Sequence, residues 1–185
     1  MKDLKIGDYY NLEQIENKIL IKESENGYED QYFHKEDIRF KILDIKENGD
    51  ILLISEKPTE QKITLKGKVG YKNGIEILDK LAREITGIEN ARSINFEDIL
   101  DSKYWEDEEK KKLIWGEDND FYYWLAPECV HASNYHAYWG LRDVDSGDVY
   151  DDDLYYSYGG EYSGDYGVRP VVCLKSKIQE KKVEG

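Results

Sequence analysis

The sequence predicts an α+β fold, with strands toward both ends of the chain and helices between them. Three segments support this prediction: residues 39–55 have the pattern of a β-hairpin, residues 70–87 that of an amphipathic helix, and residues 167–174 that of a strand rich in β-branched residues. Strands and helices that come in blocks favour an α+β arrangement over the alternating β-α-β units of a parallel sheet.

The hairpin is the clearest strand signal in the chain. Two apolar runs flank Asn48 and Gly49, a dipeptide typical of the tight turn between antiparallel strands. Apolar residues occupy both faces of residues 40–45, which we expect of a strand inside a sheet rather than at its edge. The residues before this hairpin hold only weaker strand-like pieces, separated by glycine and charged residues.

Helices are predicted in the middle of the chain. In residues 70–87 apolar side chains recur at the spacing of one helix face, and Gly87 stands where a helix C-terminus favours glycine. Asn95 and Asp98 have the spacing of a capping box. In residues 102–115 an acidic side chain precedes a lysine by four residues three times, which predicts a solvated helix face: Glu106 with Lys110, Asp107 with Lys111 and Glu108 with Lys112.

Two further strands are expected near the C-terminus, at residues 121–126 and 167–174. Pro170 has no backbone N–H to donate, so we expect the second of these strands at a sheet edge or bulged at that point. The length suits a single domain over residues 1–176, and the lysine-rich residues 177–185 are expected to form a disordered tail.

Charge is unevenly distributed and excludes several classes of partner. The formal net charge is −14, of which residues 117–174 contribute −10 from twelve acidic and two basic side chains. This segment would repel nucleic-acid phosphates and anionic lipid, and it suits a cationic or neutral polar partner. Because the sequence has no signal peptide and no apolar run long enough to cross a bilayer, we expect cytoplasmic synthesis without membrane insertion.

Residues 127–166 contain little ordinary core and have several interpretations. Three consecutive aspartates, residues 151–153, suggest calcium, but Asp148 and Leu154 stand where an EF-hand loop requires glycine and glutamate. A looser calcium site stays open, although acidic clusters are usually solvated surface. Disorder would explain the high charge, but eight tyrosines between residues 131 and 166, punctuated by Val and Leu, argue against it.

Catalysis and ligand binding are the remaining interpretations of this segment. Cys129, His131 and His136 lie near acidic residues, but they match no catalytic or metal-binding motif. We therefore expect a non-catalytic protein without a cofactor. Tyrosine mixed with Ser, Gly, Asn and Asp is instead typical of a binding surface, where tyrosine supplies contact area at low entropic cost.

The amino-acid alphabet of this segment is restricted in a way that solvent exposure does not explain. Lys, Glu, Gln, Met and Trp account for 39 of residues 1–116 but for only two of residues 131–166, Trp139 and Glu161. None of these five amino acids has a codon that ends in a pyrimidine, whereas Tyr, Asp, His, Asn, Ser, Gly and Cys all do. The pattern indicates codons of the AAY type in which adenines have been replaced.

This pattern resembles that of the variable proteins of diversity-generating retroelements. In that family a reverse transcriptase copies a template repeat with errors at adenines, and the errors enter the 3′ end of a target gene whose product binds diverse ligands. YWLAPECV (123–130) and GVRPVVCL (167–174) resemble the borders of the variable region in members from Gram-positive gut bacteria and their phages. KIGDYY (5–10) and ARSINFEDI (91–99) resemble the scaffold half of the same group.

The resemblance implies a C-type lectin-like domain over residues 1–176, with an N-terminal β-hairpin region and two or three short helices. Residues 1–120 would form the scaffold half and residues 121–174 the variable region. Trp124, Leu125, Trp139, Leu141, Val144, Val149 and Leu154 resemble scaffold positions. The positions expected to vary, and therefore to bind ligand, are His131, Ser133, Tyr135, His136, Tyr138, Gly140, Asp143, Asp145, Asp148, Tyr150, Asp151, Asp152, Asp153, Tyr156, Tyr158, Gly160, Tyr162, Gly164, Asp165 and Tyr166.

The function that the resemblance implies is non-catalytic recognition of a variable protein or glycan ligand. Such a protein would be monomeric or loosely oligomeric, and would stay in the cytoplasm, join a virion or be displayed through a partner. Two alternatives stay open. Similar WL and GVRPVV phrases occur in formylglycine-generating enzymes, which would make the chain an oxidoreductase that uses Cys129 or Cys173. A fixed structural component of a phage or cell surface would carry the same Tyr- and Asp-rich run without varying it.

Overall fold

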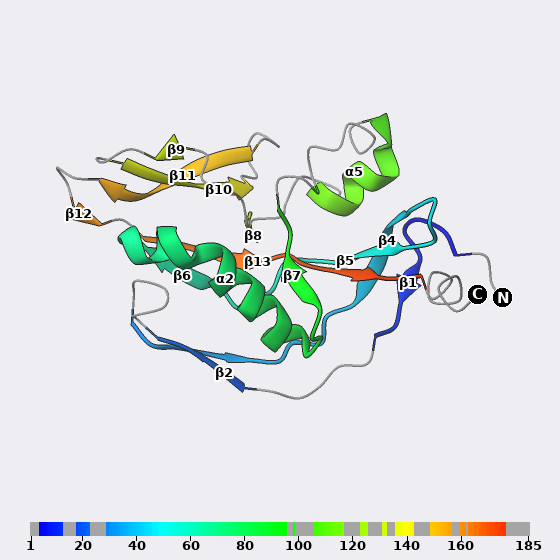
Figure 1. The fold of residues 1–185 in the computed structure, drawn as a ribbon, viewed down its shortest axis with the longest axis horizontal. Coiled ribbons are helices and arrows are strands. Elements are labelled where there is room, and N and C mark those ends of the chain that lie inside the picture. Colours follow the sequence, from blue (N-terminus) through cyan, green and yellow to red (C-terminus); the bar gives the residue numbers. More distant parts are fainter. Residues whose placement is uncertain are drawn as a thin grey trace, which may run out of the picture.

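The computed structural model is a mixed α+β protein, as the order of sequence signals predicts (Figure 1). Its described residues form sheets of five, seven and two strands together with the helices α2 and α5. The structure describes residues 4–12, 18–22, 29–95, 98, 106–116, 123–125, 131–132, 136–142, 149–156, 160–161 and 163–176.

The five-stranded sheet is antiparallel and contains the predicted hairpin. Its strand order is β1 (Tyr9–Tyr10), β4 (Phe40–Ile45), β5 (Ile51–Ser55), β14 (Pro170–Leu174) and β7 (Ala91–Ser93). The turn between β4 and β5 includes Gly49, whose φ of 82° is a conformation that glycine adopts without steric cost. The prediction that residues 40–45 form an interior strand is confirmed, because β4 lies between β1 and β5.

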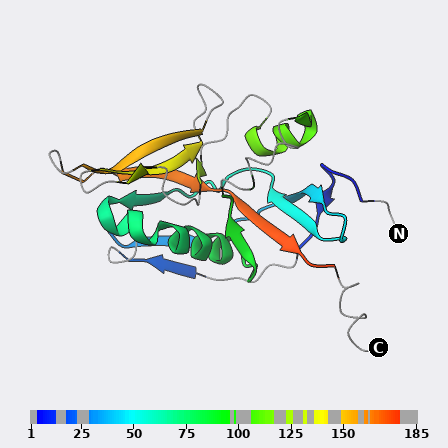
Figure 2. The same cartoon turned by 45° about the horizontal axis from the view of Figure 1, so that its top comes forward.

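The seven-stranded sheet is built mostly from the C-terminal third of the chain. Its order is β12 (Gly160–Glu161), β11 (Val149–Tyr156), β10 (His136–Arg142), β8 (Tyr123–Trp124), β13 (Ser163–Val168) and β6 (Ile63–Lys66), and β9 (His131–Ala132) also pairs with β10. The β8–β13 pair is parallel and the other described pairs are antiparallel. Figure 2 shows the C-terminal strands β13 and β14 running in line from this sheet into the five-stranded one.

Helix α2 (Gly67–Thr86) lies between the seven-stranded sheet and the small sheet of β2 (Lys18–Ile21) and β3 (Gln31–His34) (Figure 1). Most of its predicted apolar face is buried, with Leu78, Leu81 and Ile85 inaccessible to solvent, but Ile75, which was predicted on the same face, is exposed. Gly87 ends the helix in the left-handed conformation, with φ 65° and ψ 29°, as predicted. The helix starts at Gly67, three residues before the predicted start at residue 70.

The predicted capping box is confirmed by two reciprocal hydrogen bonds. The Asn95 amide donates to Asp98 Oδ2 at 2.9 Å, and the Asp98 amide donates to Asn95 Oδ1 at 3.0 Å. The same Asp98 carboxylate accepts two hydrogen bonds from the guanidinium of Arg92, at 2.6 and 2.7 Å. A local sequence signal thus also fixes a charged contact with β7.

Helix α5 (Glu108–Trp115) corrects the prediction of a wholly solvated helix face. Asp107 is its N-cap, and its side chain accepts from the amides of Glu109 and Lys110 at 3.0 and 3.2 Å. Lys110 was expected on the solvated face, yet it is buried and its Nζ lies 2.9 Å from Asp44 Oδ1 in β4. The prediction failed because the spacing rule covers partners within one helix, whereas Asp44 comes from another element.

The expectation that Pro170 marks an edge or bulged strand is wrong. Strand β14 lies between β5 and β7. Pro170 is its first residue and pairs with Ser93 of β7, whereas the register with β5 begins one residue later, at Val171 and Ile54. At this end of the strand a missing amide donor removes no hydrogen bond from the β5 ladder, so proline is tolerated inside the sheet.

Two hydrophobic clusters hold these layers together. The larger cluster joins α2 to both large sheets and includes Phe40, Leu53, Trp124 and Val172. The smaller cluster joins the five-stranded sheet to α5 and includes Leu43, Ile114, Tyr123 and Leu125. Adjacent residues of β8 therefore belong to different clusters, and Trp124 and Leu125 are fully buried as the scaffold assignment requires.

Candidate ligand-binding surface

All of the candidate binding residues that the structure describes lie on strands of the seven-stranded sheet. Thirteen of the twenty fall on β9, β10, β11, β12 and β13: His131, His136, Tyr138, Gly140, Tyr150, Asp151, Asp152, Asp153, Tyr156, Gly160, Gly164, Asp165 and Tyr166. The other seven lie outside the described residues: Ser133, Tyr135, Asp143, Asp145, Asp148, Tyr158 and Tyr162. Strands that are separate in sequence therefore bring thirteen candidates into one sheet.

The β10–β11 pair is the longest contact within this group. The two strands are antiparallel, and the register places Tyr138 opposite Asp153 and Gly140 opposite Asp151. The pairing shifts between Ala137 and Tyr138, which indicates a β-bulge at that point. Strand β10 carries two residues that resemble scaffold positions, Trp139 and Leu141, on alternate positions between His136 and Arg142.

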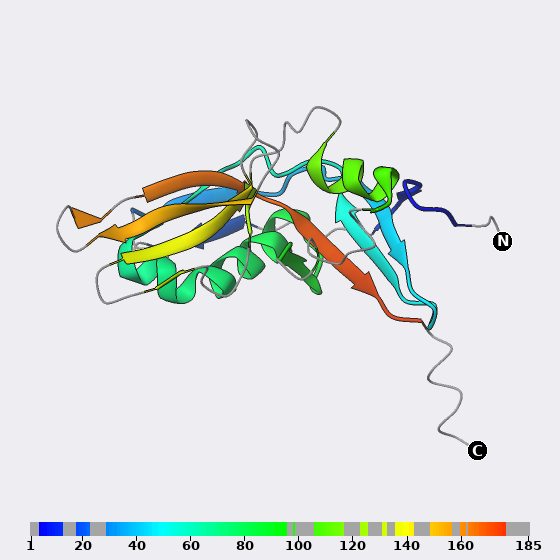
Figure 3. The ribbon, with the colours of Figure 1, turned by 90° about the horizontal axis from the view of Figure 1, so that it is seen from above.

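One side of this sheet is covered by α2. Seen from the other side, β10 and β11 lie in front of the helix, and no described helix or strand lies over them (Figure 3). Among the described elements, none covers β10 and β11 on that side, whereas the same side of β8 is buried against α5 through Tyr123, whose hydroxyl donates to the Ile114 carbonyl oxygen at 3.1 Å.

Trp124 anchors the covered face of the sheet. Its ring is fully buried, and Nε1 donates to the carbonyl oxygen of Ile63 in β6 at 2.9 Å. Leu141 of β10 lies opposite Trp124 in the antiparallel pair, and Val168 of β13 lies opposite Trp124 in the parallel pair. A buried indole with a satisfied N–H therefore links three strands at the base of the candidate surface.

Tyr166 and Asp165 are the two candidates whose side chains the structure describes. The ring of Tyr166 is half-buried and meets the ring of Trp124 edge to face, with centroids 4.8 Å apart. Asp165 is exposed, and its Oδ1 accepts from Thr64 Oγ1 at 3.4 Å. Neighbouring positions of β13 thus differ: Asp165 is accessible to a ligand, whereas Tyr166 contacts the core.

Arg169 is a buried residue that sequence reasoning did not assign. It lies between β13 and β14, and its guanidinium donates to the carbonyl oxygens of Ser55 at 2.9 Å and Leu113 at 2.6 Å. Its Cζ also lies 5.6 Å from the centre of the Tyr123 ring. A lone arginine within the apolar run GVRPVV was the available signal, because a charge in such a run must find buried partners.

Gly167 is required by a close approach of two backbones. A Cβ atom at this position would lie 2.7 Å from the carbonyl oxygen of Thr59. Thr59 and Val168 are joined on both sides, since Val168 N donates to Thr59 Oγ1 and Thr59 N donates to the Val168 carbonyl, each at 2.8 Å. The end of β13 is therefore fixed against the loop that follows β5.

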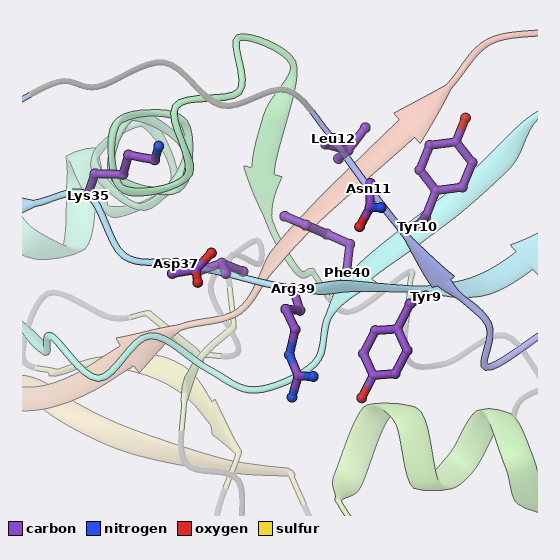
Figure 4. A pocket seen from close by; sticks show the side chains of 9 residues that line it. Tyr9, Tyr10, Asn11, Leu12, Lys35, Asp37, Arg39 and Phe40 are labelled. Carbon is purple, nitrogen blue, oxygen red and sulfur yellow. The ribbon is translucent and has the colours of Figure 1, made fainter.

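A cavity of about 320 Å³ lies away from this surface, between β1 and the residues that lead into β4 (Figure 4). Tyr9 and Arg39 lie on one side of it, with the Arg39 Cζ 4.9 Å from the Tyr9 ring centre. Both side chains contact Glu56: Arg39 at 2.5 Å, and Tyr9 through its hydroxyl. Burial alone would raise the pKa of Glu56, but the hydrogen bond that Tyr9 donates to it and the positive charges of Lys41 and Arg39 hold the pKa below its usual value. These groups already satisfy one another, so we rank this cavity below the strand surface.

The structure bears only partly on the metal and cysteine hypotheses. Among the residues whose side chains are described, no group of three or more His, Cys, Asp or Glu side chains is placed to hold a metal ion. The aspartates considered for calcium, residues 151–153, lie outside that set. Cys173 is a free thiol, half-buried against the smaller cluster, and Cys129 lies outside the described residues.

Comparison with known proteins gives no relative for this chain: no family profile, no curated protein and no solved structure matches it. None of the described helices is both long and apolar enough to cross a membrane.

Proposed function

We propose that this protein binds variable ligands through the Tyr-, Asp-, Ser- and Gly-rich strands of its seven-stranded sheet, and that it performs no catalysis. The proposal includes a C-type lectin-like fold and diversification of the surface by adenine-directed mutagenesis, as in the variable proteins of diversity-generating retroelements. The ligand would be a protein or glycan that is cationic or neutral. The protein would be made in the cytoplasm, and then remain there, join a virion or be displayed by a partner.

One observation supports the proposal most: the restricted alphabet coincides with strands that have one face covered by no described helix or strand. The segment in which Lys, Glu, Gln, Met and Trp are nearly absent supplies β9, β10, β11 and β12 and most of β13. Of these strands, β10, β11 and β13 contact α2 on one side, and no described helix or strand covers β10 and β11 on the other (Figure 3). Substitutions on an open face usually change stability by about 0.5 kcal/mol or less, so such a face tolerates diversification.

The residues around that face support a division between a fixed framework and a surface that can vary. Trp124 and Arg169 are fully buried and hydrogen-bonded, and Gly167 is held by a close backbone contact. These residues precede and follow the restricted segment in the chain. A fixed border on both sides would keep the strands in register while the residues between them change.

The gene itself tests this proposal. The codons of the twenty candidate positions should end in a single pyrimidine, and a nearly identical, AAY-rich repeat should lie close by with a reverse transcriptase gene. Related loci should differ at these positions and agree at Trp124, Gly167 and Arg169. Mixed third bases, or a run that stays constant between related loci, would contradict diversification and favour a fixed structural component.

A further inference from the structure

We propose that the strand register divides the candidate positions into two functional classes. This proposal rests on the proposed function. Outer positions, represented by Tyr138, Gly140, Asp151 and Asp153, contact the ligand. Inner positions, represented by Tyr150, Asp152 and Tyr166, are positioning residues that set how the sheet lies on α2. Diversification at inner positions would therefore change the shape of the surface rather than its contact chemistry.

Trp124 identifies the inner face. Residues directly opposite each other on neighbouring strands share a face of the sheet, and successive residues of a strand alternate between faces. Trp124 is fully buried in the cluster that contains the α2 residues Leu78 and Leu81. The face that Trp124 occupies is therefore the one toward α2.

The register carries this assignment across two strands. Leu141 of β10 lies opposite Trp124, and Tyr150 of β11 lies opposite Leu141, so position 150 falls on the inner face. Two residues farther along, Trp139 lies opposite Asp152, which places position 152 on the same face. Two candidate positions with typical paratope residues thus belong to the side of the sheet that α2 covers.

The intervening pairs belong to the opposite face. Tyr138 lies opposite Asp153, and Gly140 lies opposite Asp151. These pairs alternate with the Leu141–Tyr150 and Trp139–Asp152 pairs. The outer positions therefore form two adjacent rows across β10 and β11 on the face that Figure 3 presents.

Tyr166 provides independent support from a described side chain. It lies two residues before Val168, the parallel partner of Trp124, so the alternation places it on the inner face. Its ring does lie there: it is half-buried and packs edge to face on Trp124. Asp165, one residue earlier, is exposed, as an outer position should be.

Two matched double variants test the division, because they make the same chemical changes on the two faces. The outer variant combines Tyr138→Ser with Asp153→Asn, and the inner variant combines Tyr150→Ser with Asp152→Asn. The outer variant should keep the melting temperature of the parent chain, whereas the inner variant should lower it by about 5 °C or more, because the register places positions 150 and 152 on the side of the sheet that α2 covers. Equal shifts, or a larger shift for the outer variant, would overturn the division.

Tyrosine nitration of the folded parent chain gives a second measurement that needs no ligand. Tetranitromethane followed by peptide mass spectrometry should modify Tyr138 in the native protein, and should modify Tyr150 and Tyr166 only after unfolding in urea. Rapid native nitration of Tyr150 with protection of Tyr138 would reverse the assignment of faces and overturn the division.

Display libraries separate a failure of this division from a failure of the proposed function. One library randomises positions 138, 140, 151 and 153, and the other positions 150, 152 and 166, with the same Tyr, Asp, Ser, Asn, Gly and His alphabet. Lysozyme serves as a basic protein target. Binders should come from the outer library and far fewer from the inner one. If both variants and nitration behave as expected but neither library yields binders, the result counts against ligand binding and leaves the division of faces intact.

Discussion

The guanidinium of Arg169 donates to the carbonyl oxygen of Leu113 at 2.6 Å across 56 residues of sequence. Leu113 lies in the last turn of α5, where helix carbonyls have no partner within the helix and attract positive charge. The same side chain donates to Ser55, at the end of β5. One buried cation thus joins a helix, a strand and the junction of β13 and β14, beside the candidate surface.

Replacing Arg169 should therefore destabilise the fold strongly. Arg169→Leu leaves several buried carbonyl oxygens without a donor, at a cost of about 1–3 kcal/mol for each such group. We expect a loss of about 3 kcal/mol or more in the free energy of unfolding, measured by urea titration. Arg169→Lys keeps the charge but not the planar set of donors, so its loss should be smaller. A loss below about 1 kcal/mol for Arg169→Leu would show that water can replace these contacts.

Gly167→Ala should also destabilise the protein, for a steric reason. The added methyl group would lie 2.7 Å from the Thr59 carbonyl oxygen, and the backbone must shift to relieve the overlap. We expect a loss of about 1–3 kcal/mol in unfolding free energy. Asp165→Ala is the control, because it alters an exposed residue of the same strand and should stay within about 0.5 kcal/mol of the parent. Equal stability of the two variants would contradict the contact.

The buried Asp44–Lys110 pair predicts a non-additive pair of substitutions. Lys110→Met leaves the Asp44 carboxylate buried without its ammonium partner, 2.9 Å away in the parent. Loss of one partner from a buried pair costs about 3–5 kcal/mol. Adding Asp44→Leu removes the stranded charge, so the double variant should be more stable than the sum of the single losses predicts. Additive losses in a double-mutant cycle would show that the two groups do not interact.

Asp79 predicts a pH-dependent effect. Burial raises the pKa of its carboxyl above the usual 3.8, although the Ser93 amide donates to it at 2.9 Å. Because the native pKa of Asp79 lies above its unfolded pKa, the carboxyl group favours folding while it is protonated. This contribution to stability is fully present below the unfolded pKa and is lost as the pH rises through the native pKa. Asp79→Asn keeps an acceptor for Ser93 and removes the charge. The variant should therefore melt above the parent at pH 7 and no higher than the parent near pH 3. A lower melting temperature at pH 7 would show that the carboxylate stabilises the fold through Arg83 and Arg92.

Local signals in the sequence predicted the elements that local interactions form. The Asn48–Gly49 turn, the end of α2 at Gly87 and the Asn95–Asp98 capping box each depend on residues within a few positions of one another. These three signals also agree with the predicted α+β class, which the observed order of strands and helices confirms.

Features set by distant partners could not be predicted in this way. Lys110 has the sequence neighbours of a solvated lysine, and only Asp44, 66 residues away, makes it a buried one. Pro170 suggested an edge strand because the sequence does not show which residue of β14 begins the β5 ladder. For the candidate surface, composition indicated which segment binds, whereas the division into inner and outer positions needs the β8–β10–β11 register.

The central claim is that an apolar framework holds its shape while the outer positions of the sheet are free to change, and thermal unfolding tests it most directly. A variant that combines Tyr138→Ser, Asp151→Asn, Asp153→Asn and Asp165→Asn alters four outer positions together. With at most about 0.5 kcal/mol for each exposed substitution, the four changes together should cost at most about 2 kcal/mol and lower the melting temperature by no more than about 8 °C. Unfolding of this variant at room temperature, or a melting temperature lowered by 10 °C or more, would place these residues in the core and contradict the account.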